Sequence, residues 1–373
     1  MKKVIITGVT GQDGSYMADY LLANTDCEVY GMVRRTSKPD YTNLTEAIKN
    51  PRFKLVTGDL SDANSLESLV REIKPDYFIN FAAQSFVGTS WQIPEQTFDV
   101  TATGVLRILE SIRKHAPKCR FYSAGSSEEM GNVVTSPQTI DHPIRVRSPY
   151  GAAKAAARHL TKVYRESYNL YAVHCLLYNH ESERRGEEFV TRKITKGVAR
   201  IVKAINEGKE FQPIELGNLD AKRDWSHAKD FVEAIWKILN QEIYYIPQSA
   251  QELKQGIREP KEYVLSSNET HSIREFIEKA FKVAGIEGVW HGERTNEEYS
   301  IANYLMDICD VKSSVLVKIN PKFYRPAEVD LLLGDSSPAR NELGWTPKIS
   351  FDKLVELMVL SDINSISASP LIS

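Results

Sequence analysis

A tyrosine and a lysine stand four residues apart in the segment Tyr150-Gly-Ala-Ala-Lys154. On a helix, residues at positions i and i+4 share one face, so the lysine ammonium can lie beside the phenol. A positive charge in that place favours the phenolate and lowers the pKa of the tyrosine from its ordinary value of about 10. The spacing therefore predicts a general base that works nearer neutral pH, although the same spacing also occurs by chance on helix surfaces.

A glycine-rich stretch near the N-terminus is the second chemical signal. It has the form GxxGxxG, and it lies between the apolar run 4–7 and a helical pattern at 15–23. Glycines there let the backbone approach a pyrophosphate at the N-terminus of the following helix, whereas the alternative is a plain structural turn. Because of its position we expect a dinucleotide to contact Gly8, Thr10, Gly11, Gln12, Asp13 and Gly14.

The end of the second apolar run indicates which dinucleotide binds. A site that prefers NAD usually has an acidic residue there, for the ribose hydroxyls. This chain has Arg34, Arg35 and Ser37 instead. Since a guanidinium is a good partner for a 2′-phosphate, we favour NADP over NAD, with a solvated basic loop as the alternative.

These residues must be positioned by a regular framework, and the first half of the chain predicts one. Short apolar runs that do not alternate with polar residues occur at 4–7, 28–33, 53–56, 77–80, 120–123 and 172–177. Helical patterns separate the runs. Repeated β-α-β units of this kind predict an α/β fold with a doubly wound, Rossmann-type parallel sheet, whose ligand lies at the carboxyl ends of the strands.

The second half is less regular and predicts a smaller α/β lobe. Helices are expected over 198–205 and 231–238, and a capping box at Ser272 and Glu275 opens another that stops at Gly285. We expect residues 1–178 to form the cofactor domain, to which later residues at about 215–240 return. Residues 179–360 are expected to form mainly the substrate lobe. The serine-rich end, 361–373, is expected to fray.

Composition excludes several classes of protein. The 373 residues contain 47 Lys and Arg and 49 Asp and Glu, for a formal charge of −2. That balance argues against a nucleic-acid binder and against an acidic disordered chain. There is no apolar run of membrane-spanning length and no signal peptide. The widely spaced Cys27, Cys119, Cys175 and Cys309 indicate reduced thiols in the cytoplasm, with no metal site.

Taken together, the motifs resemble a known family. GxxGxxG, Asn80-Phe-Ala-Ala-Gln-Ser85 and the Tyr150/Lys154 pair look like the extended short-chain dehydrogenase/reductase family. The match is closer still to the GDP-mannose 4,6-dehydratases within it, in stretches from residue 4 to about 358. They include Arg147-Ser-Pro-Tyr-Gly-Ala-Ala-Lys154, Asn179-His-Glu-Ser182, Phe189-Val-Thr-Arg-Lys193, Leu216-Gly-Asn-Leu-Asp-Ala-Lys-Arg-Asp-Trp225 and Tyr324-Arg-Pro-Ala-Glu-Val-Asp330.

The resemblance implies a 4,6-dehydration with no net redox change, on a tightly held NADP. Tyr150, with Lys154 beside it, takes the proton from the sugar O4 while hydride leaves C4. The resulting ketone acidifies the C5 proton, a carboxylate removes it, the C6 hydroxyl leaves as water, and hydride returns to C6. In this scheme Ser126 bonds O4, and Glu128 is both the C5 base and the acid for the departing hydroxyl.

At this point the sequence departs from the family. The usual pattern is Thr-Ser-Glu, then an apolar residue, an aromatic residue and Gly, whereas this chain has Ser126-Ser127-Glu128-Glu129-Met130-Gly131. The serine keeps the hydroxyl. We expect Glu129 and Met130 to alter the pocket wall below the sugar. Glu129 also stands as an alternative catalytic carboxylate, or as a plain surface one.

The remaining contacts follow from the resemblance. On the cofactor side they are Asp59 and Leu60 at the adenine, Phe81, Ala82, Ala83, Gln84 and Ser85 at the ribose and nicotinamide, and His180 and Arg185. Asp59 could instead cap the next helix. The substrate side has Ser85, Asn179, Val190, Leu216 and Gly217, with Lys193, Arg223 and Arg325 at the phosphates and Glu328 at the guanine or ribose edge.

Other functions stay open from the sequence. A GDP-manno-heptose 4,6-dehydratase is kept open by the Glu129–Met130 change and by the long segment from Ile286 to Asp310. A reductase or epimerase of the same family is disfavoured by Glu128, and a non-catalytic NADP-binding protein by the intact Ser126, Tyr150 and Lys154. The resemblance also implies a homodimer or homotetramer, with the loop from Arg35 to Asn50 reaching a neighbour.

Overall fold

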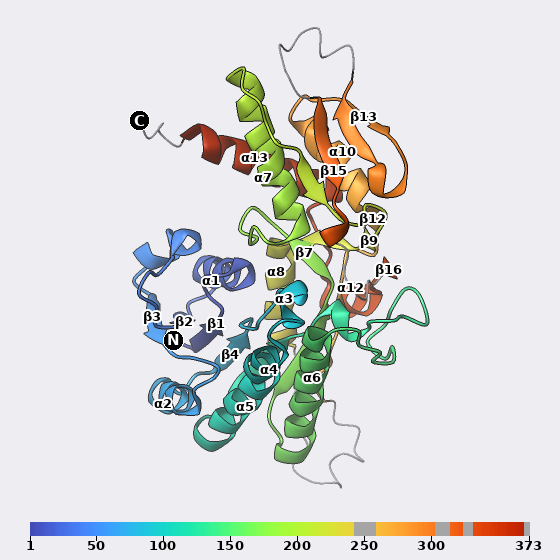
Figure 1. Ribbon diagram of the computed structural model, residues 1–373. Coiled ribbons are helices and arrows are strands. Elements are labelled where there is room, and N and C mark those ends of the chain that lie inside the picture. The colour runs from blue at the N-terminus through green and yellow to red at the C-terminus, as the bar shows by residue number, and fades with distance from the viewer. Residues whose placement is uncertain (242–258, 303–313, 324–330, 369–373) are drawn as a thin grey trace.

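A parallel sheet of seven strands forms one half of the molecule (Figure 1). The computed structural model describes residues 1–241, 259–302, 314–323 and 331–368. The strands, in sheet order, are β11 (Val264–Leu265), β6 (Ala172–Leu177), β5 (Arg120–Ala124), β4 (Tyr77–Asn80), β1 (Lys3–Thr7), β2 (Glu28–Val33) and β3 (Phe53–Thr57). Every neighbouring pair is parallel, and the chain order reverses between β1 and β4.

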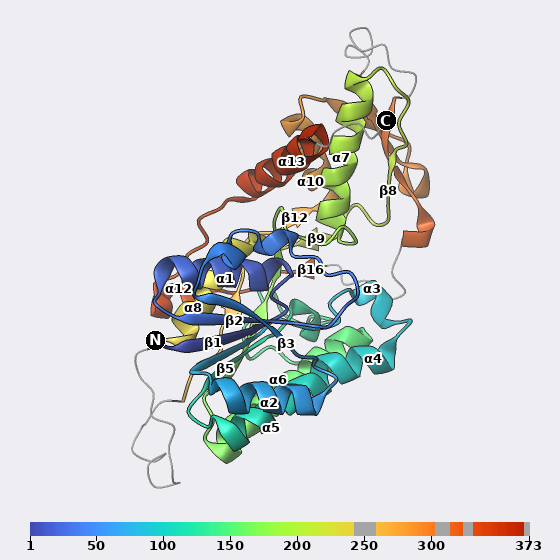
Figure 2. The same ribbon diagram turned by 90° about the vertical axis from the view of Figure 1, so that its left-hand side faces the viewer.

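Helices cover both faces of this sheet (Figure 2). One face packs against α1 (Gln12–Asn24), α8 (Ala228–Leu239) and α12 (Ser337–Leu343), and the other against α2 (Ala63–Ile73), α5 (Gly104–His115) and α6 (Pro149–Tyr168). Successive residues of one strand therefore enter different cores. Ile6 belongs to the α1 and α8 side and Ile5 to the opposite side. Burial on both faces explains why the strands are apolar without alternation, and it confirms the predicted doubly wound α/β fold.

Local side-chain caps start several of these helices. The Asp62 side chain accepts a hydrogen bond from Asn64 N at 3.0 Å and begins α2. Ser148 accepts from Gly151 N at 3.0 Å and begins α6. These side chains satisfy amide groups that have no partner within the helix. The cap of α6 matters most, because that helix carries Tyr150 and Lys154.

A second core lies above the sheet, in the half of Figure 1 that holds α7 and α10. A four-stranded sheet runs in the order β13 (Gly288–His291), β14 (Glu298–Ile301), β15 (Val315–Ile319) and β8 (Ile214–Leu216). Its apolar residues pack with α7 (Val190–Asn206), α10 (Ile273–Val283) and α13 (Phe351–Ala368). Short pairings near the junction are β7 (Asn179–Glu181) with β10 (Trp225–His227), and β9 (Lys222–Arg223) with β12 (His271–Ser272) and β16 (Leu331–Leu332).

The expectation of a frayed C-terminal tail is wrong for residues 361–368. Helix α13 continues to Ala368. Met358 and Val359 are buried in the second core, and the fully buried Asp362 accepts a hydrogen bond from Thr195 on α7 at 2.7 Å and pairs with Arg192 at 2.9 Å. This serine-rich segment therefore forms a helix, which is held in place by contacts with α7. Residues 369–373 lie outside the described residues.

Later parts of the chain return to the first sheet. Helix α8, strand β11 and helix α12 all pack in the core that contains β1 and α1. Within the range 215–240 only α8 packs there, since β8 pairs with β15 in the other sheet. We therefore propose a cofactor domain made of residues 1–178 with α8, β11 and α12, and a substrate lobe made mainly of the rest.

Candidate active site

The glycine-rich turn joins β1 to α1 at the point where the strand order reverses. Gly8 has φ +67°, and a Cβ atom there would lie 2.9 Å from Ala82 N on the neighbouring strand's loop. A Cβ atom on Gly14 would lie 2.4 Å from Gly8 O. Helix α1 begins after Gly11 with no side-chain cap on its first amide groups. The turn therefore brings bare backbone and the N-terminus of a helix to the carboxyl ends of β1 and β4, as an anion site requires.

The segment that follows β6 packs directly on this turn. His180 Nε2 lies 2.9 Å from Asp13 Oδ2, and His180 Nδ1 donates to Tyr178 O at 2.7 Å. Gln12 Nε2 donates to His180 O at 3.0 Å, and Ser182 Oγ donates to Gln12 Oε1 at 2.7 Å. The side chains of Gln12, Asp13 and His180, all predicted cofactor contacts, are thus occupied in joining two distant segments.

The Asp13–His180 pair carries opposite charges. Burial opposes ionisation of both groups, but their mutual attraction outweighs it. As a result, the pKa of Asp13 is lowered from 3.8 and the pKa of His180 is raised from 6.5. The segment after β6 is therefore held on the glycine-rich turn by an ion pair as well as by hydrogen bonds.

Tyr150 and Lys154 lie buried on one face of α6, one turn apart. Lys154 Nζ is 5.8 Å from the centre of the Tyr150 ring and donates to Ala124 O, at the end of β5, at 2.6 Å. Burial lowers the pKa of Lys154 to about 8, while the negative charges of Glu129 and Asp13 act in the opposite direction. The ammonium is therefore held at the carboxyl end of the sheet, beside the phenol.

The sequence argument predicted a lowered pKa for Tyr150, and this prediction is wrong. Burial raises the pKa of Tyr150 above 10, and the charges of Glu128 and Glu129 add to that effect. A hydrogen bond with Ser126 and the charge of Arg185 act against it. The spacing of the two residues is as expected on a helix, but it could not reveal the burial of the phenol or the two carboxylates beside it.

Ser126 and Glu128 lie on the loop directly after β5. Ser126 begins the short 3₁₀ turn Ser127–Glu129, where its Oγ accepts from Glu128 N at 3.2 Å. The side chain of the same serine also acts on Tyr150, where it lowers the pKa of the phenol. Glu128 is half-buried, and a Cβ atom on Gly151 would lie 2.7 Å from Glu128 O, so the loop rests on the first turn of α6. The structure thus brings Ser126, Glu128, Tyr150 and Lys154 together.

Glu129 and Met130 do not take the places that the sequence suggested. The Glu129 side chain is fully buried, where its Oε1 lies 2.9 Å from His174 Nε2 and accepts from Ser126 N at 2.9 Å. Met130 is also fully buried, in a cluster with Leu176 and Val264. Glu129 is therefore no surface carboxylate, and neither side chain forms an exposed pocket wall. The partner of Glu129 comes from β6, far along the chain, so the loop sequence could not reveal it.

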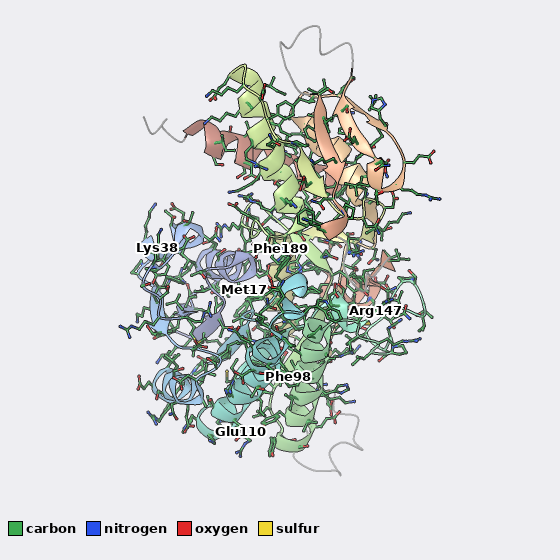
Figure 3. The ribbon with its side chains drawn as sticks, viewed as in Figure 1. Met17, Lys38, Phe98, Glu110, Arg147 and Phe189 are labelled. Atoms are coloured by element: carbon green, nitrogen blue, oxygen red, sulfur yellow. The ribbon has the colours of Figure 1, made fainter. Side chains whose placement is uncertain are left out.

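Arg185 reaches the same region from the other side. Its Nε pairs with Glu181 Oε2 at 3.1 Å, and its guanidinium carbon lies 3.4 Å from the centre of the Phe189 ring. Phe189 lies at the junction of the two halves (Figure 3) and meets the ring of Phe86 edge-on at 5.7 Å. Glu181 and Phe189 were not predicted as site residues from the sequence. Their spacing of four residues on either side of Arg185 was the available signal, and it was weak.

The remaining predicted cofactor residues lie on loops at the carboxyl ends of β2, β3 and β4. Arg34, Arg35 and Ser37 are exposed, and in the described part of the chain neither arginine has a carboxylate partner. Asp59 Oδ1 accepts from Ser61 N at 2.9 Å and Ser61 Oγ at 2.7 Å, and Asp62 caps α2 instead. The side chains that follow β4 are partly or fully exposed, namely Phe81, Ala82, Ala83, Gln84 and Ser85. Leu60 is buried.

The predicted substrate residues lie at the junction and in the upper half. Asn179 begins β7, and its Oδ1 is buried without a hydrogen-bond partner among the described residues. Lys193 Nζ on α7 lies 3.7 Å from the centre of the Phe323 ring, and burial lowers the pKa of Lys193. The others are Val190 at the start of α7, Leu216 and Gly217 at the end of β8, and the buried Arg223 of β9. Arg325 and Glu328 lie outside the described residues.

The sequence predicted no metal site and no membrane-spanning segment, and it predicted reduced cysteines. The described ranges contain no cluster of three or more His, Cys, Asp or Glu residues that could hold a metal ion. Within the same ranges, no helix combines the length and the apolar character that crossing a membrane requires. Cys27, Cys119 and Cys175 are free and buried, and Cys309 lies outside the described residues.

Comparison with known proteins identifies the family of this chain. The family described as "GDP-mannose 4,6 dehydratase" matches residues 5–358, which is nearly the whole chain. The chain belongs to the GDP-mannose 4,6-dehydratase family. A GDP-mannose 4,6 dehydratase of Drosophila melanogaster is 43% identical over 378 residues, covering 99% of this chain and 88% of that protein. One of Homo sapiens is 41% identical over 374 residues, covering 98% and 92%.

A solved structure supports the fold of this family member. A UDP-glucuronic acid 4-epimerase from Bacillus cereus superposes with a TM-score of 0.75 at 20% identity, covering 97% of this chain and 99% of that one. At that identity the likeness concerns the fold, including the added upper half. Membership of the dehydratase family therefore rests on the sequence match.

Proposed function

We propose that this protein dehydrates GDP-mannose to GDP-4-keto-6-deoxymannose as a hydro-lyase. The observation that carries the proposal is the convergence of Ser126, Glu128, Tyr150 and Lys154 at the carboxyl end of β5 in a full-length member of the family. A base, an acid and a hydroxyl donor beside a nucleotide turn are the groups that a 4,6-dehydration needs.

NADP is the cofactor that we propose, and the residues fit it. The bare turn at Gly8 and Gly14 and the uncapped start of α1 suit a pyrophosphate, while the exposed Arg34 and Arg35 suit a 2′-phosphate. When bound there, the nicotinamide supplies the oxidation at C4 and the reduction at C6. Asp59 and Leu60 would lie at the adenine, and the loop from Phe81 to Ser85 at the ribose.

The protein's own groups move the protons. Tyr150 takes the proton from the O4 hydroxyl, while Ser126 bonds the same oxygen and the Lys154 ammonium stabilises the phenolate. Once C4 is a ketone, the C5 proton is acidic, and Glu128 removes it. Glu128 then donates that proton to the leaving C6 hydroxyl, so that one water is lost and the carboxylate is restored. When C6 is reduced, C5 must regain a proton; the proton that Tyr150 took from O4 balances it, so the phenolate is restored as well.

The diphosphate of the substrate would lie between the two halves of the molecule. Lys193 and Arg223 supply positive charge there, as Arg325 would from its place outside the described residues, and Asn179 offers a buried amide at the junction. The half-buried Lys193 carries its charge in partly dry surroundings, where an anion binds more strongly than at an open surface.

GDP-mannose is favoured over GDP-manno-heptose as the substrate. The heptose alternative depended on Glu129 and Met130 reshaping the pocket wall, and both side chains are fully buried away from any open wall. Its second basis, the segment from Ile286 to Asp310, includes β13 and β14 of the upper sheet, but residues 303–310 lie outside the described residues.

One assay tests the proposal. The purified protein is incubated with NADP and either GDP-mannose or GDP-manno-heptose, and the product is analysed by mass spectrometry. We expect a loss of about 18 mass units from GDP-mannose, and a fall in kcat of roughly 100-fold or more in Glu128→Gln. Glu72→Gln, which changes an exposed glutamate of α2, is the matched control and should retain the wild-type rate. An unchanged mass, or a wild-type rate in Glu128→Gln, would refute the assignment.

Assembly and location remain predictions. A homodimer or homotetramer is expected from the family, and light scattering of the purified protein measures it. A cytoplasmic location is expected from the cysteine usage, and the buried Cys27, Cys119 and Cys175 are compatible with it.

A further inference from the structure

Glu129 is a buried ionisable group that the proposed reaction does not use. Its side chain is fully enclosed, yet its carboxylate lies next to the loop that carries Ser126 and Glu128. A buried charge is costly unless it is paired and hydrogen-bonded, and a side chain that only filled space here could be apolar. The contacts of Glu129 therefore call for a reason beyond packing.

Two hydrogen bonds converge on one oxygen of this carboxylate. Ser126 N donates to Glu129 Oε1 at 2.9 Å, and His174 Nε2 lies 2.9 Å from the same atom. His174, on β6, is fully buried and is fixed at its other nitrogen by Ser123 Oγ at 3.0 Å. The histidine thus holds the glutamate in one orientation, and the glutamate holds the backbone of Ser126.

Gly125 leaves space for the contact between His174 and Glu129. A Cβ atom on Gly125 would lie 2.5 Å from His174 Nε2 and 2.5 Å from Cys175 O. Any larger residue at position 125 would therefore push the imidazole away from Glu129. The histidine, the glycine and the glutamate come from β6 and from the loop after β5, and they fit only as a set.

The position of Ser126 matters to the reacting groups. Its Oγ accepts from Glu128 N at 3.2 Å, and its side chain acts on Tyr150, where it lowers the pKa of the phenol. A shift of the Ser126 backbone would therefore move both the hydroxyl that meets Tyr150 and the carboxylate assigned to C5. Misplacement of reacting groups by about 1 Å can lower a rate by roughly 100-fold.

The charge of Glu129 also reaches Lys154. Burial opposes ionisation of Glu129, but the charge and hydrogen bond of His174 outweigh it and lower the pKa of the carboxyl group. The resulting negative charge supports the Lys154 ammonium against its own burial. The charged or titratable groups that act on this pair from neighbouring elements are Asp13, Glu128, Tyr150, Arg158, His174 and Tyr178.

We propose that Glu129, held by His174, is a positioning residue for the proton-transfer groups: it fixes the backbone of Ser126 and keeps a negative charge beside Lys154. The proposal rests on the roles given above to Ser126 and Lys154, and it adds a pair that the usual family pattern, with an apolar residue after the catalytic glutamate, does not contain.

The test separates charge from shape with Glu129→Gln, whose amide oxygen can still accept from Ser126 N. The matched control is Glu262→Gln, because Glu262 Oε1 accepts from the backbone N of the same His174 at 2.9 Å but has no contact with Ser126. The first readout needs no substrate. It is the pH titration of the Lys154 ¹³Cε resonance by NMR, assigned through its loss in Lys154→Arg.

We expect the Lys154 titration midpoint to fall by roughly half a pH unit or more in Glu129→Gln and to stay unchanged in Glu262→Gln. In turnover of GDP-mannose, the pH at which kcat/KM levels off should move down by the same amount, while KM changes less than about 2-fold. A wild-type midpoint and a wild-type levelling-off pH in Glu129→Gln would overturn the proposal.

Two further arms keep the result decisive. If Glu129→Gln does not fold, the double variant Glu129→Leu with His174→Leu removes both polar partners at similar volume. A folded double variant with the wild-type Lys154 midpoint and wild-type kcat would overturn the proposal, and a lowered midpoint with a lower kcat would support it. If the wild-type protein does not dehydrate GDP-mannose, the proposed function fails, while the NMR arm still decides the role of Glu129.

Discussion

His180 and Asp13, which lie 167 residues apart in the chain, are joined by a 2.9 Å contact between Nε2 and Oδ2. The contact pins the segment that carries Arg185 onto the glycine-rich turn. Because His180 Nδ1 also donates to Tyr178 O at 2.7 Å, both ring nitrogens need a proton for the two bonds to coexist. The protonated imidazole therefore links the nucleotide turn to the part of the chain that crosses into the upper half.

Asp13→Asn should destabilise the protein most in mildly acidic solution. The pKa of His180 is raised from 6.5, so its contribution is complete below that value and is lost as the pH rises through the folded pKa. The pKa of Asp13 is lowered from 3.8, so its contribution is complete above that value and is lost as the pH falls through the folded pKa. We expect a loss of roughly 1–3 kcal/mol between those two values and a smaller loss at pH 9, measured by urea unfolding.

Glu67→Gln is the control for this experiment. Glu67 contacts His115 at the same 2.9 Å, but both side chains are partly exposed, at 35% and 24%. Its substitution should therefore destabilise the protein less than Asp13→Asn does. An Asp13→Asn penalty that is equal at pH 5.5 and pH 9 would contradict an ionised bridge.

Gly14→Ala should be far more damaging than Gly11→Ala, although both glycines belong to the same motif. A Cβ atom at Gly14 would lie 2.4 Å from Gly8 O and 2.6 Å from Val9 Cα, whereas at Gly11 the nearest such atom is 3.3 Å away. We expect a loss of roughly 2–4 kcal/mol in the first case and about 1 kcal/mol in the second. Urea unfolding without added nucleotide measures both, and an equal loss would show that the turn adapts.

Arg34→Ala combined with Arg35→Ala should remove the preference for NADP. If the guanidinium groups bind a 2′-phosphate, affinity for NADP should fall by about 10- to 100-fold, while affinity for NAD changes less than about 2-fold. Lys38→Ala, on the same exposed loop, is the control for a general loss of positive charge. Isothermal titration of the wild type and of both variants with each dinucleotide measures these affinities, and parallel losses for NADP and NAD would refute the 2′-phosphate assignment.

The parts of this molecule that could be predicted from the sequence are those determined by local pattern. Strands β1, β4, β5 and β6 are buried along almost their whole length, so each can be recognised as an apolar run, and Asp62 and Ser148 mark the helix starts that the structure contains. The placement of Tyr150 and Lys154 on one helix face needed only their spacing and the family resemblance.

What the sequence could not predict depends on contacts across the fold. The burial of Glu129 requires His174 from β6 and the gap at Gly125, and none of these can be inferred from the loop alone. The ordered end of α13 depends on α7, from which Thr195 donates a hydrogen bond to Asp362 and Arg192 pairs with its carboxylate. In both cases a polar residue has a buried partner that is far away in the chain, so the hydrophobic periodicity of the sequence does not reveal the contact.

Lys154 should set an alkaline limit to catalysis. Its ammonium is buried and bonded to Ala124 O at 2.6 Å, and burial lowers the pKa of Lys154 to about 8. Because the pKa of Tyr150 is raised above 10, the population of the phenolate–ammonium form rises with pH only up to the pKa of Lys154; above it, each gain of phenolate is matched by a loss of ammonium, so kcat/KM for GDP-mannose should level off near pH 8. In Lys154→Arg the guanidinium stays protonated, so kcat/KM should go on rising above pH 8 even if the rate at pH 7 is lower. Lys118→Arg, at an exposed position, should keep the wild-type profile. A wild-type profile that goes on rising to pH 10 would mean that the charge of Lys154 is not needed, and the general base would then have to be stabilised by Arg185 or by the bound cofactor instead.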